Sequence, residues 1–316
     1  MTSRPRLLFQ HVSIMVLLTM MLTLQSCFTG VESTPKITSK DIKRRGVTES
    51  AEKNILANIK PQAPAHWTPG KQFYILDTKV SMIFENFTGD SLTTLIPYHK
   101  ITFRGVSPRR SITGQEVTIV SFITDDKHIL TYNSGIEYQH LSSLKTLDIP
   151  FAIETDIIDS VAQRLVGNTY YIIPARRLST TGTDTVGQRY TPVTITAVSP
   201  GTASYPLKVL FTDNSGNNSA ILMTIGDRAS STRNFDRIFS ISDPRKSYPM
   251  INDETWQLII NSRLKDGMTT QECRLAIGPP NDIQRVPSTA GMIERWTYDD
   301  GIYLIFEDGI LARYRY

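Results

Sequence analysis

Short apolar runs recur along residues 67–250, and this pattern limits the possible folds more than any other feature of the chain. Turn residues separate the runs, among them Asn133-Ser134-Gly135, Thr181-Gly182 and the segment 213–216. Regularly spaced short strands with turns between them are typical of small sandwiches or barrels. The predicted strands cover residues 73–76, 80–84, 100–103, 116–122, 129–132, 169–173, 193–197, 207–211 and 220–224.

A weak internal repeat divides this region into two parts. Residues 70–76 resemble 167–173, residues 98–108 resemble 190–200, and residues 120–126 resemble 209–214. The order of the matches is kept while the connections shorten, as expected for repeated structural units. We therefore predict two tandem β-units, 67–156 and 157–250, with a connecting helix over 157–166 whose apolar positions are 157, 158, 161 and 165.

The hydrophobic period changes in the C-terminal part, 251–316. Asn252 or Asp253 can cap a helix around Trp256, and Thr269-Thr-Gln-Glu272 has the pattern of a capping box that opens a second helix. Four strands follow, over 283–286, 294–298, 302–306 and 311–316, with Asp-Gly turns between the last three. The predicted fold class is mainly β, with a C-terminal α+β domain of two helices packed on a small antiparallel sheet.

The N-terminus has the pattern of a secretory signal peptide. An uncharged, mostly apolar run over 12–27 follows a leader whose only charged side chains are Arg4 and Arg6, and it ends in Ser26-Cys27. The run is too short for a spanning helix. We predict a signal peptide over 1–26 and a largely flexible tether over 27–66, which leaves room for a short helix over 49–60.

The Ser26-Cys27 end resembles the lipobox of bacterial lipoproteins. The resemblance implies cleavage between Ser26 and Cys27 and a lipid on the sulfur of Cys27, which would anchor the protein to a membrane. Phe28 stands where an Asp would favour inner-membrane retention in the Gram-negative sorting scheme, so the resemblance implies the outer membrane. A plain secreted or otherwise anchored protein is the alternative, and the periplasmic or surface face stays open.

Composition adds two limits. The chain has 316 residues and a net charge of +4, without the dense basic cluster that a nucleic-acid partner would need. Only two cysteines are present, so a lipid on Cys27 leaves Cys273 without an internal disulfide partner. We expect Cys273 to be a small buried residue on a helix.

The C-terminal motifs resemble the SmpA/OmlA domain of small outer-membrane lipoproteins. The segment from Gly267 to Pro280, the Trp296-Thr-Tyr298 strand and the hairpin from Tyr303 to Leu311 carry the likeness, which covers about residues 253–316. The resemblance implies a protein-interaction domain at the outer membrane, where one such lipoprotein is a subunit of the β-barrel assembly machinery. The overall layout also resembles lipoproteins of Bacteroides-type bacteria.

The sequence offers no catalytic motif. The histidines after the apolar run have no metal-ligand spacing, and no nucleophile elbow, Ser-x-x-Lys or phosphate-binding loop is present. The acid pairs Asp125-Asp126 and Asp299-Asp300 lie in predicted turns, where exposed carboxylates are common. We expect a non-enzymatic protein with no metal site and no cofactor other than the covalent lipid on Cys27.

The terminal hairpin carries the candidate interface, because Tyr and Arg are enriched among interface anchors. Simple alternation along the last strand places Ala312, Tyr314 and Tyr316 on one face, and Leu311, Arg313 and Arg315 on the other. One face should pack on the helices and the other meet solvent or a partner; an ordinary half-exposed sheet is the alternative. The candidate residues are Tyr303, Arg313, Tyr314, Arg315 and Tyr316.

Together these features favour an outer-membrane lipoprotein that binds other envelope proteins, with a role in outer-membrane assembly or integrity. The first alternative is a surface lipoprotein that binds a glycan or another ligand through aromatic residues of the β-units. The second is an enzyme whose site gathers His99, His128 or His140 with distant carboxylates. An inhibitor of the β-lactamase-inhibitor type is a third. The sequence leaves any small-molecule ligand open.

Overall fold

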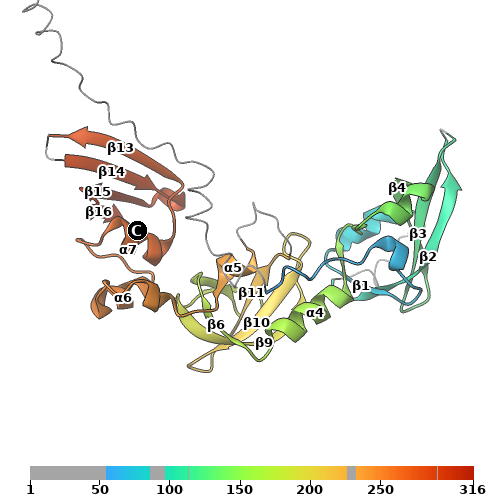
Figure 1. Ribbon diagram of the computed structural model, residues 1–316, viewed down its shortest axis with the longest axis horizontal. Coiled ribbons are helices and arrows are strands. Elements are labelled where there is room, and N and C mark those ends of the chain that lie inside the picture. The colour runs from blue at the N-terminus through green and yellow to red at the C-terminus, as the bar shows by residue number, and fades with distance from the viewer. Residues whose placement is uncertain (1–54, 86–96, 113, 226–232, 290) are drawn as a thin grey trace, which may run out of the picture. The chain divides into compact units, whose positions relative to one another are not determined.

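A computed structural model describes residues 55–85, 97–112, 114–225, 233–289 and 291–316. The predicted signal peptide, the Ser26-Cys27 junction and most of the predicted tether lie outside these residues. The described chain is mainly β, with curled sheets and a few helices (Figure 1). None of its described helices is both long and apolar enough to cross a membrane.

The first sheet has five antiparallel strands in the order β4-β3-β2-β1-β5. The chain between β1 and β2 also reaches the far edge, where Phe84 forms a bridge with Tyr132 of β4. This bridge curls the sheet around its core. The strands are β1 (Gln72–Ile75), β2 (Lys100–Arg110), β3 (Glu116–Thr124), β4 (Ile129–Glu137) and β5 (Ala152–Glu154).

The second sheet has seven strands in the order β12-β6-β9-β10-β11-β7-β8. Its hairpin β7–β8 lies in the chain between β6 and β9, and it joins the sheet where Leu178 pairs with Ala220 of β11. The strands are β6 (Thr169–Ile172), β7 (Arg176–Leu178), β8 (Asp184–Val186), β9 (Thr191–Pro200), β10 (Leu207–Asp213), β11 (Asn218–Met223) and β12 (Phe239–Ser240).

Strand pairing shows that these two sheets repeat one plan. The order β5-β1-β2-β3-β4 of the first corresponds to β12-β6-β9-β10-β11 of the second. Phe103 pairs with Phe122 in the first sheet, and Ile195 pairs with Phe211 in the second. The register shifts immediately after each of these pairs, so even the β-bulge is repeated.

The turns repeat as well. Tyr98 and Tyr190 both have positive φ, 74° and 53°. The backbone N–H of Tyr98 donates to the carbonyl of Ile75, which ends β1, and that of Tyr190 donates to the carbonyl of Ile172, which ends β6. The β3–β4 turn has Lys127 at φ 71°, where the β10–β11 turn has Gly216 at φ 82°. The three sequence matches thus fall on equivalent backbone positions.

The third sheet has the order β13-β14-β15-β16, entirely antiparallel. Its strands are β13 (Asp282–Ser288), β14 (Gly291–Thr297), β15 (Tyr303–Glu307) and β16 (Ile310–Arg315). The α-helices are α4 (Thr155–Leu165), α5 (Phe235–Ile238), α6 (Asp253–Ile260) and α7 (Thr270–Ile277). Short 3-10 helices are η2 (Pro64–His66), η3 (Thr78–Ile83), η5 (Tyr138–Ser143), η6 (Pro244–Ser247) and η7 (Asp299–Gly301).

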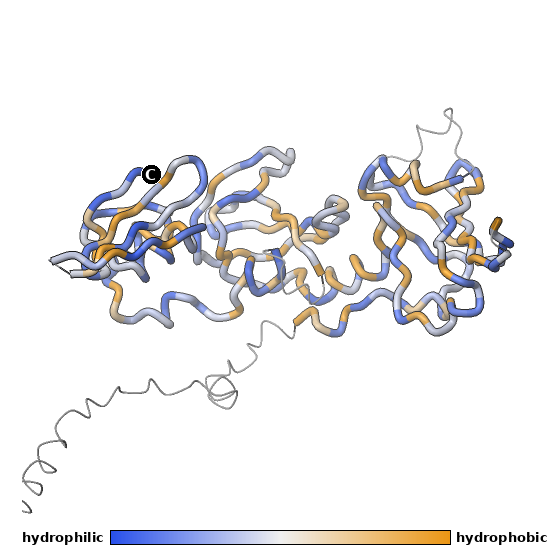
Figure 2. The backbone as a smooth tube through the Cα atoms, turned by 90° about the horizontal axis from the view of Figure 1, so that it is seen from above, coloured by the Kyte–Doolittle hydropathy of each residue, from blue (hydrophilic) through white to orange (hydrophobic). Residues whose placement is uncertain are grey.

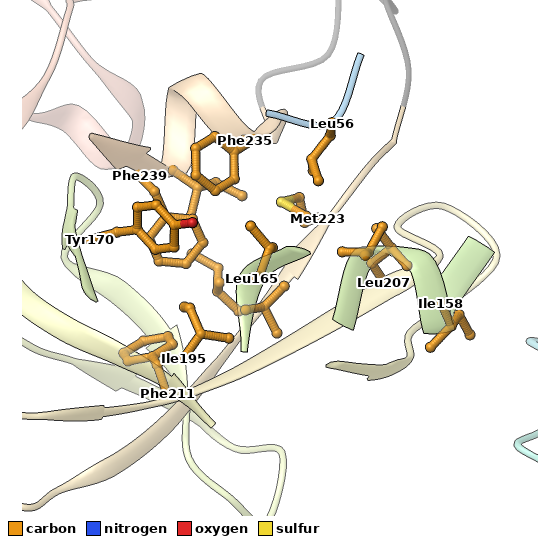
Figure 3. Packing of buried hydrophobic residues seen from close by; sticks show 14 of the residues in the cluster. Leu56, Ile158, Leu165, Tyr170, Ile195, Leu207, Phe211, Met223, Phe235 and Phe239 are labelled. Atoms are coloured by element: carbon orange, nitrogen blue, oxygen red, sulfur yellow. The ribbon is translucent and has the colours of Figure 1, made fainter. Parts of the chain in front are cut away.

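Each sheet has its own hydrophobic cluster, built from apolar segments that recur along the chain (Figure 2). In the second cluster, Phe235 and Phe239 lie together with Tyr170, and Figure 3 also shows Phe211, whose ring centre is 6.2 Å from that of Phe239. The predicted connecting helix is confirmed as α4. It buries Ile157, Ile158, Val161 and Leu165 in this second cluster.

Two sequence predictions are wrong in the first sheet. Residues 78–83 form a 3-10 helix and not a strand, because the Asp77 side chain accepts the backbone N–H of Lys79 and caps a turn. The segment Asn133-Ser134-Gly135 is not a turn but lies inside β4. The Ser134 hydroxyl donates to the Thr118 carbonyl beside a register shift, so the irregular residues are absorbed as a bulge.

The packed part of the chain begins before residue 67. Residues 55–60 form turns and not the end of a helix, yet Leu56 is buried in the second cluster and Ile55 and Ile59 pack against it. These side chains were expected in the tether. Their apolar character reflects this long-range packing and not local helix formation.

Candidate functional site

The candidate interface lies on the C-terminal sheet, β13–β16. One face of this sheet packs against α7, because Trp296, Leu304, Phe306 and Leu311 share a cluster with Cys273 and Ala276 of the helix. This inner face also holds the Trp296 indole, which donates to Glu294 at 3.0 Å. The opposite face is the one available to a partner.

The start of α7 is fixed by the predicted capping box, which is confirmed. The Thr269 hydroxyl accepts the Glu272 backbone N–H at 3.2 Å, and the Glu272 carboxylate accepts the Thr269 N–H at 2.7 Å. The segment before the helix also runs along β16, since the Gly267 N–H donates to Leu311 and the Leu311 N–H to Met268. These bonds hold β16 to the helical layer.

A β-bulge in β16 overturns the predicted assignment of faces. Phe306 of β15 pairs with Leu311, but the residue before it, Ile305, pairs with Arg313 and not with Ala312. Ala312 is therefore an extra residue, and the alternation of side chains is reversed after it. Tyr314, opposite the buried Leu304, lies on the inner face with Leu311, and Arg313 lies on the outer one.

The outer face brings together three of the five predicted interface residues. Tyr303 pairs with Arg315, and its neighbour on the same face, Ile305, pairs with Arg313. Arg295 of β14 stands opposite Ile305 and joins them, with its guanidinium carbon 5.6 Å from the centre of the Tyr303 ring. We call this set, Arg295, Tyr303, Ile305, Arg313 and Arg315, the arginine face.

The arginine face is open and cationic. Its three arginines are exposed, while Tyr303 and Ile305 are half-buried between them. A cation over an aromatic ring and exposed guanidinium groups beside an apolar centre are features of interface anchors. Glu307 lies on the same face, diagonal to Arg295 and Arg313, but among the described residues it forms no ion pair with either of them. The chemistry suits an acidic partner surface.

The other two predicted residues lie elsewhere. The Tyr314 hydroxyl donates to the Leu264 carbonyl at 3.0 Å and so ties β16 to the segment after α6. Tyr316 follows the last residue of β16 and is 60% exposed. Sequence reasoning missed Arg295. This residue lies in the predicted strand 294–298, next to Trp296, but only the register of β14 and β15 shows that it faces the same side as Tyr303.

Cys273 is buried as expected, and it lies in α7. Burial, reinforced by the nearby Glu272 charge, raises the pKa of its thiol to about 12. The thiol is therefore protonated at neutral pH, and a protonated thiol is a poor nucleophile.

The histidines are dispersed over the first sheet. His128 contacts Asp126 at 2.8 Å and His140 contacts Glu137 at 3.2 Å, both at exposed positions. Within the described ranges, no group of three or more His, Cys, Asp or Glu side chains stands in an arrangement that could hold a metal ion. The gathering of histidines that an assembled catalytic site would need is not seen among these residues.

Comparison of the chain with protein-family models, with curated proteins and with solved structures gives no match.

Proposed function

We propose that this protein is a lipid-anchored protein of the bacterial outer membrane that binds an acidic surface of another envelope protein through the arginine face. The anchor is the lipid on Cys27 that the Ser26-Cys27 pattern implies. Binding, and not catalysis, is the proposed activity. A role in outer-membrane assembly or integrity follows from the resemblance of the C-terminal motifs to SmpA/OmlA lipoproteins.

The observation that carries the proposal is the composition of the open sheet face. Arg295, Arg313 and Arg315 surround Tyr303 and Ile305, and the register of β14, β15 and β16 places them side by side. Residues directly opposite in neighbouring strands lie about 5 Å apart, close enough to act as one surface. We further propose that α6, α7 and β13–β16 form an α+β domain of SmpA/OmlA type.

A site-specific crosslinking experiment in the native host tests the interaction. A photo-crosslinking amino acid at Ile305 lies at the centre of the arginine face, while the same group at Met82, which is 80% exposed, lies in the first sheet region. We expect one prominent protein adduct from position 305 that is missing from position 82. The proposal fails if both positions give the same products, or if position 305 gives none.

Charge reversal supplies the energetic test. Arg295→Glu with Arg313→Glu should weaken the isolated complex at least tenfold, which corresponds to about 1.4 kcal/mol. Arg104→Glu with Arg237→Glu is the matched control, because both arginines are exposed and lie on β2 and α5, away from β13–β16 in the chain. Equal effects of the two reversals would show that net charge, and not this face, governs binding.

Fractionation tests the anchor separately. The wild-type protein should remain with the outer membrane after washing with salt and carbonate, and Cys27→Ala should not. Recovery of the wild-type protein entirely in the soluble periplasmic fraction would refute the anchoring part of the proposal and leave the interaction part to the crosslinking result.

A further inference from the structure

The second sheet contains a buried arginine that no part of the proposed interaction uses. Arg177 lies in β7, which joins the sheet edge through the Leu178–Ala220 pair. The residue is only 5% exposed. Its guanidinium donates from Nη2 to the Gln188 carbonyl, and its central carbon lies 5.5 Å from the centre of the Phe211 ring.

This cation lacks the partner that buried charges usually have. Its Nε is buried and has no hydrogen-bond partner among the described residues. Its electrostatic partner in the neighbourhood, Asp213, makes no ion-pair contact with it within the described part of the chain. Buried charges are generally paired with an opposite charge or bind a ligand. Burial accordingly lowers the pKa of Arg177, an effect that Asp213 only partly opposes.

Asp213 is committed to a turn and not to the arginine. Its carboxylate accepts the backbone N–H groups of Ser215 and Asn217, both at 2.9 Å, and the Asn217 amide at 3.1 Å. Burial acts to raise its pKa, but these hydrogen bonds bring the pKa below its ordinary value. In the first sheet, Thr124 occupies the same turn position and accepts the N–H of His128.

The internal repeat shows that the fold does not require an arginine here. Leu178 pairs with Ala220, so Arg177 stands beside Ile221 in β11. The equivalent of Ile221 in the first sheet is Tyr132, because Ile221 pairs with Val209 of β10 and Tyr132 pairs with the equivalent valine of β3. Tyr132 in turn forms a bridge with Phe84. Phe84 thus holds the position that Arg177 holds in the second sheet.

The residues beneath these two positions also correspond. Phe84 packs on Phe122, with ring centres 6.0 Å apart, and Phe211 is the repeat equivalent of Phe122. Figure 3 shows Phe211 among the buried side chains of the second cluster. An aromatic pair in one sheet has therefore become an arginine over an aromatic ring in the other. The charge has no counterpart in the shared architecture, so it calls for a separate explanation.

A hollow of about 540 Å³ lies beside Arg177. That volume is within the range of small-molecule sites. Gly187 forms part of its wall and leaves room for the guanidinium, because a Cβ atom there would lie 2.5 Å from the guanidinium carbon. Asp213 also lines the hollow, where its carboxylate accepts the hydrogen bonds of its own turn. Hydroxyl and amide groups make up much of the remaining lining, including those of Ser179, Thr185, Gln188, Thr191, Asn218 and Ser219.

We propose that this hollow is a binding site for an acidic saccharide, with the sugar carboxylate held by Arg177 and the sugar hydroxyls by the polar rim. Guanidinium groups pair with planar carboxylates through parallel hydrogen bonds. Hydroxyl and amide side chains match the hydrogen-bonding groups of a sugar ring. The site is independent of the arginine face, so either proposal can fail without the other.

Calorimetric titration of the purified full-length protein in detergent tests the site. The probes are D-glucuronate and D-galacturonate, with D-glucose, acetate and inorganic phosphate as comparisons. We expect at least one uronate to bind with a Kd below about 1 mM, and at least tenfold more tightly than glucose or acetate. Binding of neither uronate overturns the proposal. Phosphate binding as tight as uronate binding overturns the assignment to a saccharide.

The first sheet supplies the variant. Arg177→Phe introduces the residue that the repeat tolerates at this position, and it should reduce uronate affinity at least tenfold while the protein keeps its thermal unfolding temperature. Arg176→Phe is the matched control, because Arg176 is the exposed neighbour in the same strand. Unchanged uronate binding in Arg177→Phe overturns the proposal.

A rim variant covers the case in which Arg177→Phe does not fold. Asn218 is exposed at the start of β11, and Asn218→Ala removes one lining amide. We expect this variant to weaken uronate binding and to leave acetate binding unchanged. Equal uronate affinity of Asn218→Ala and the wild type would refute the proposal that the polar rim holds the sugar hydroxyls.

Discussion

Replacing Lys71 by methionine should destabilise the first sheet more than a typical surface substitution would. The Lys71 amino group lies 3.0 Å from Glu154 and 2.6 Å from Asp156. The side chains of Lys71 and Glu154 are only 4% and 6% exposed, whereas that of Asp156 is 67% exposed. The variant would leave the Glu154 carboxylate buried next to an apolar side chain.

The expected magnitude follows from this burial. Removing one partner of a buried ion pair costs about 3–5 kcal/mol, because the remaining charge stays desolvated. The contact with Asp156 adds little, since exposed ion pairs contribute about 0–1 kcal/mol. The Gln62 backbone N–H still donates to Glu154 at 3.2 Å, which places our expectation near the lower end of the range.

The repeat offers a matched double variant. Ile241 is the residue that follows β12, and continuing the β12–β6 register by one residue gives it the place that Glu154 has in the β5–β1 ladder. Lys71→Met combined with Glu154→Ile removes both charges, and such apolar replacements of buried pairs are often neutral or stabilising. We expect the double variant to recover at least about 2 kcal/mol of the loss in the single variant.

Urea unfolding, followed by fluorescence and circular dichroism, measures both variants. Trp67 is a suitable reporter because it is buried in the same cluster as Phe73. A loss below about 1 kcal/mol in Lys71→Met would refute the argument from burial. A double variant as unstable as the single one would show that packing, and not the uncompensated charge, causes the loss.

The pH dependence provides a second check. Burial lowers the pKa of Lys71, but hydrogen bonds to Asp156 and Glu154 outweigh it and raise the pKa above its ordinary value. Because the pKa of Lys71 is raised in the folded state, the stabilisation that its charged amino group gives the folded protein is complete below about pH 10.4 and is lost as the pH rises further. The advantage of the wild type over Lys71→Met should therefore be constant from about pH 7 to 9 and decrease only above about pH 10.4.

Two further predictions concern the C-terminal part. Cys273 is buried and its thiol has a pKa of about 12, so in the native protein it should not react with a thiol reagent at pH 8. In denaturant it should react fully, as measured by the absorbance of the released reagent. Prompt reaction of the native protein would contradict the burial of Cys273. Thr269→Ala should destabilise the region around α7 by about 1 kcal/mol through loss of the capping box, while Thr270→Ala, inside the helix, should have little effect in urea unfolding. Similar losses in both variants would mean that the cap is not the stabilising element.

Local sequence patterns were sufficient for many of the elements. The helix α4 and its buried positions follow from apolar spacing, and the Thr269 cap follows from a motif that needs no distant residue. The repeat matches also located equivalent strands and turns, because the same short-range pattern of apolar and turn residues recurs. In each case the information lies within a few residues of the element.

Long-range pairing decided the rest. The 80–84 strand prediction failed because alternation alone cannot exclude a capped 3-10 turn, and the faces of β16 were reversed by a bulge at Ala312 that has no local sequence mark. The β7–β8 hairpin and the burial of Arg177 also escaped sequence reasoning. Arg177 lies in a short polar segment, and nothing in that segment indicates that it will pair with β11, which is distant in the sequence, and be buried there.

By itself, the sequence determined the period of each segment, the caps, the two-fold repetition and the residue types available to each face. Only the tertiary structure decided which side chains share a surface. The arginine face exists because the bulge in β16 places Arg313 and Arg315 beside Arg295 and Tyr303, and Arg177 is desolvated because it lies over Phe211. Register and burial depend on pairing between distant segments, whereas periodicity is a local property of the chain.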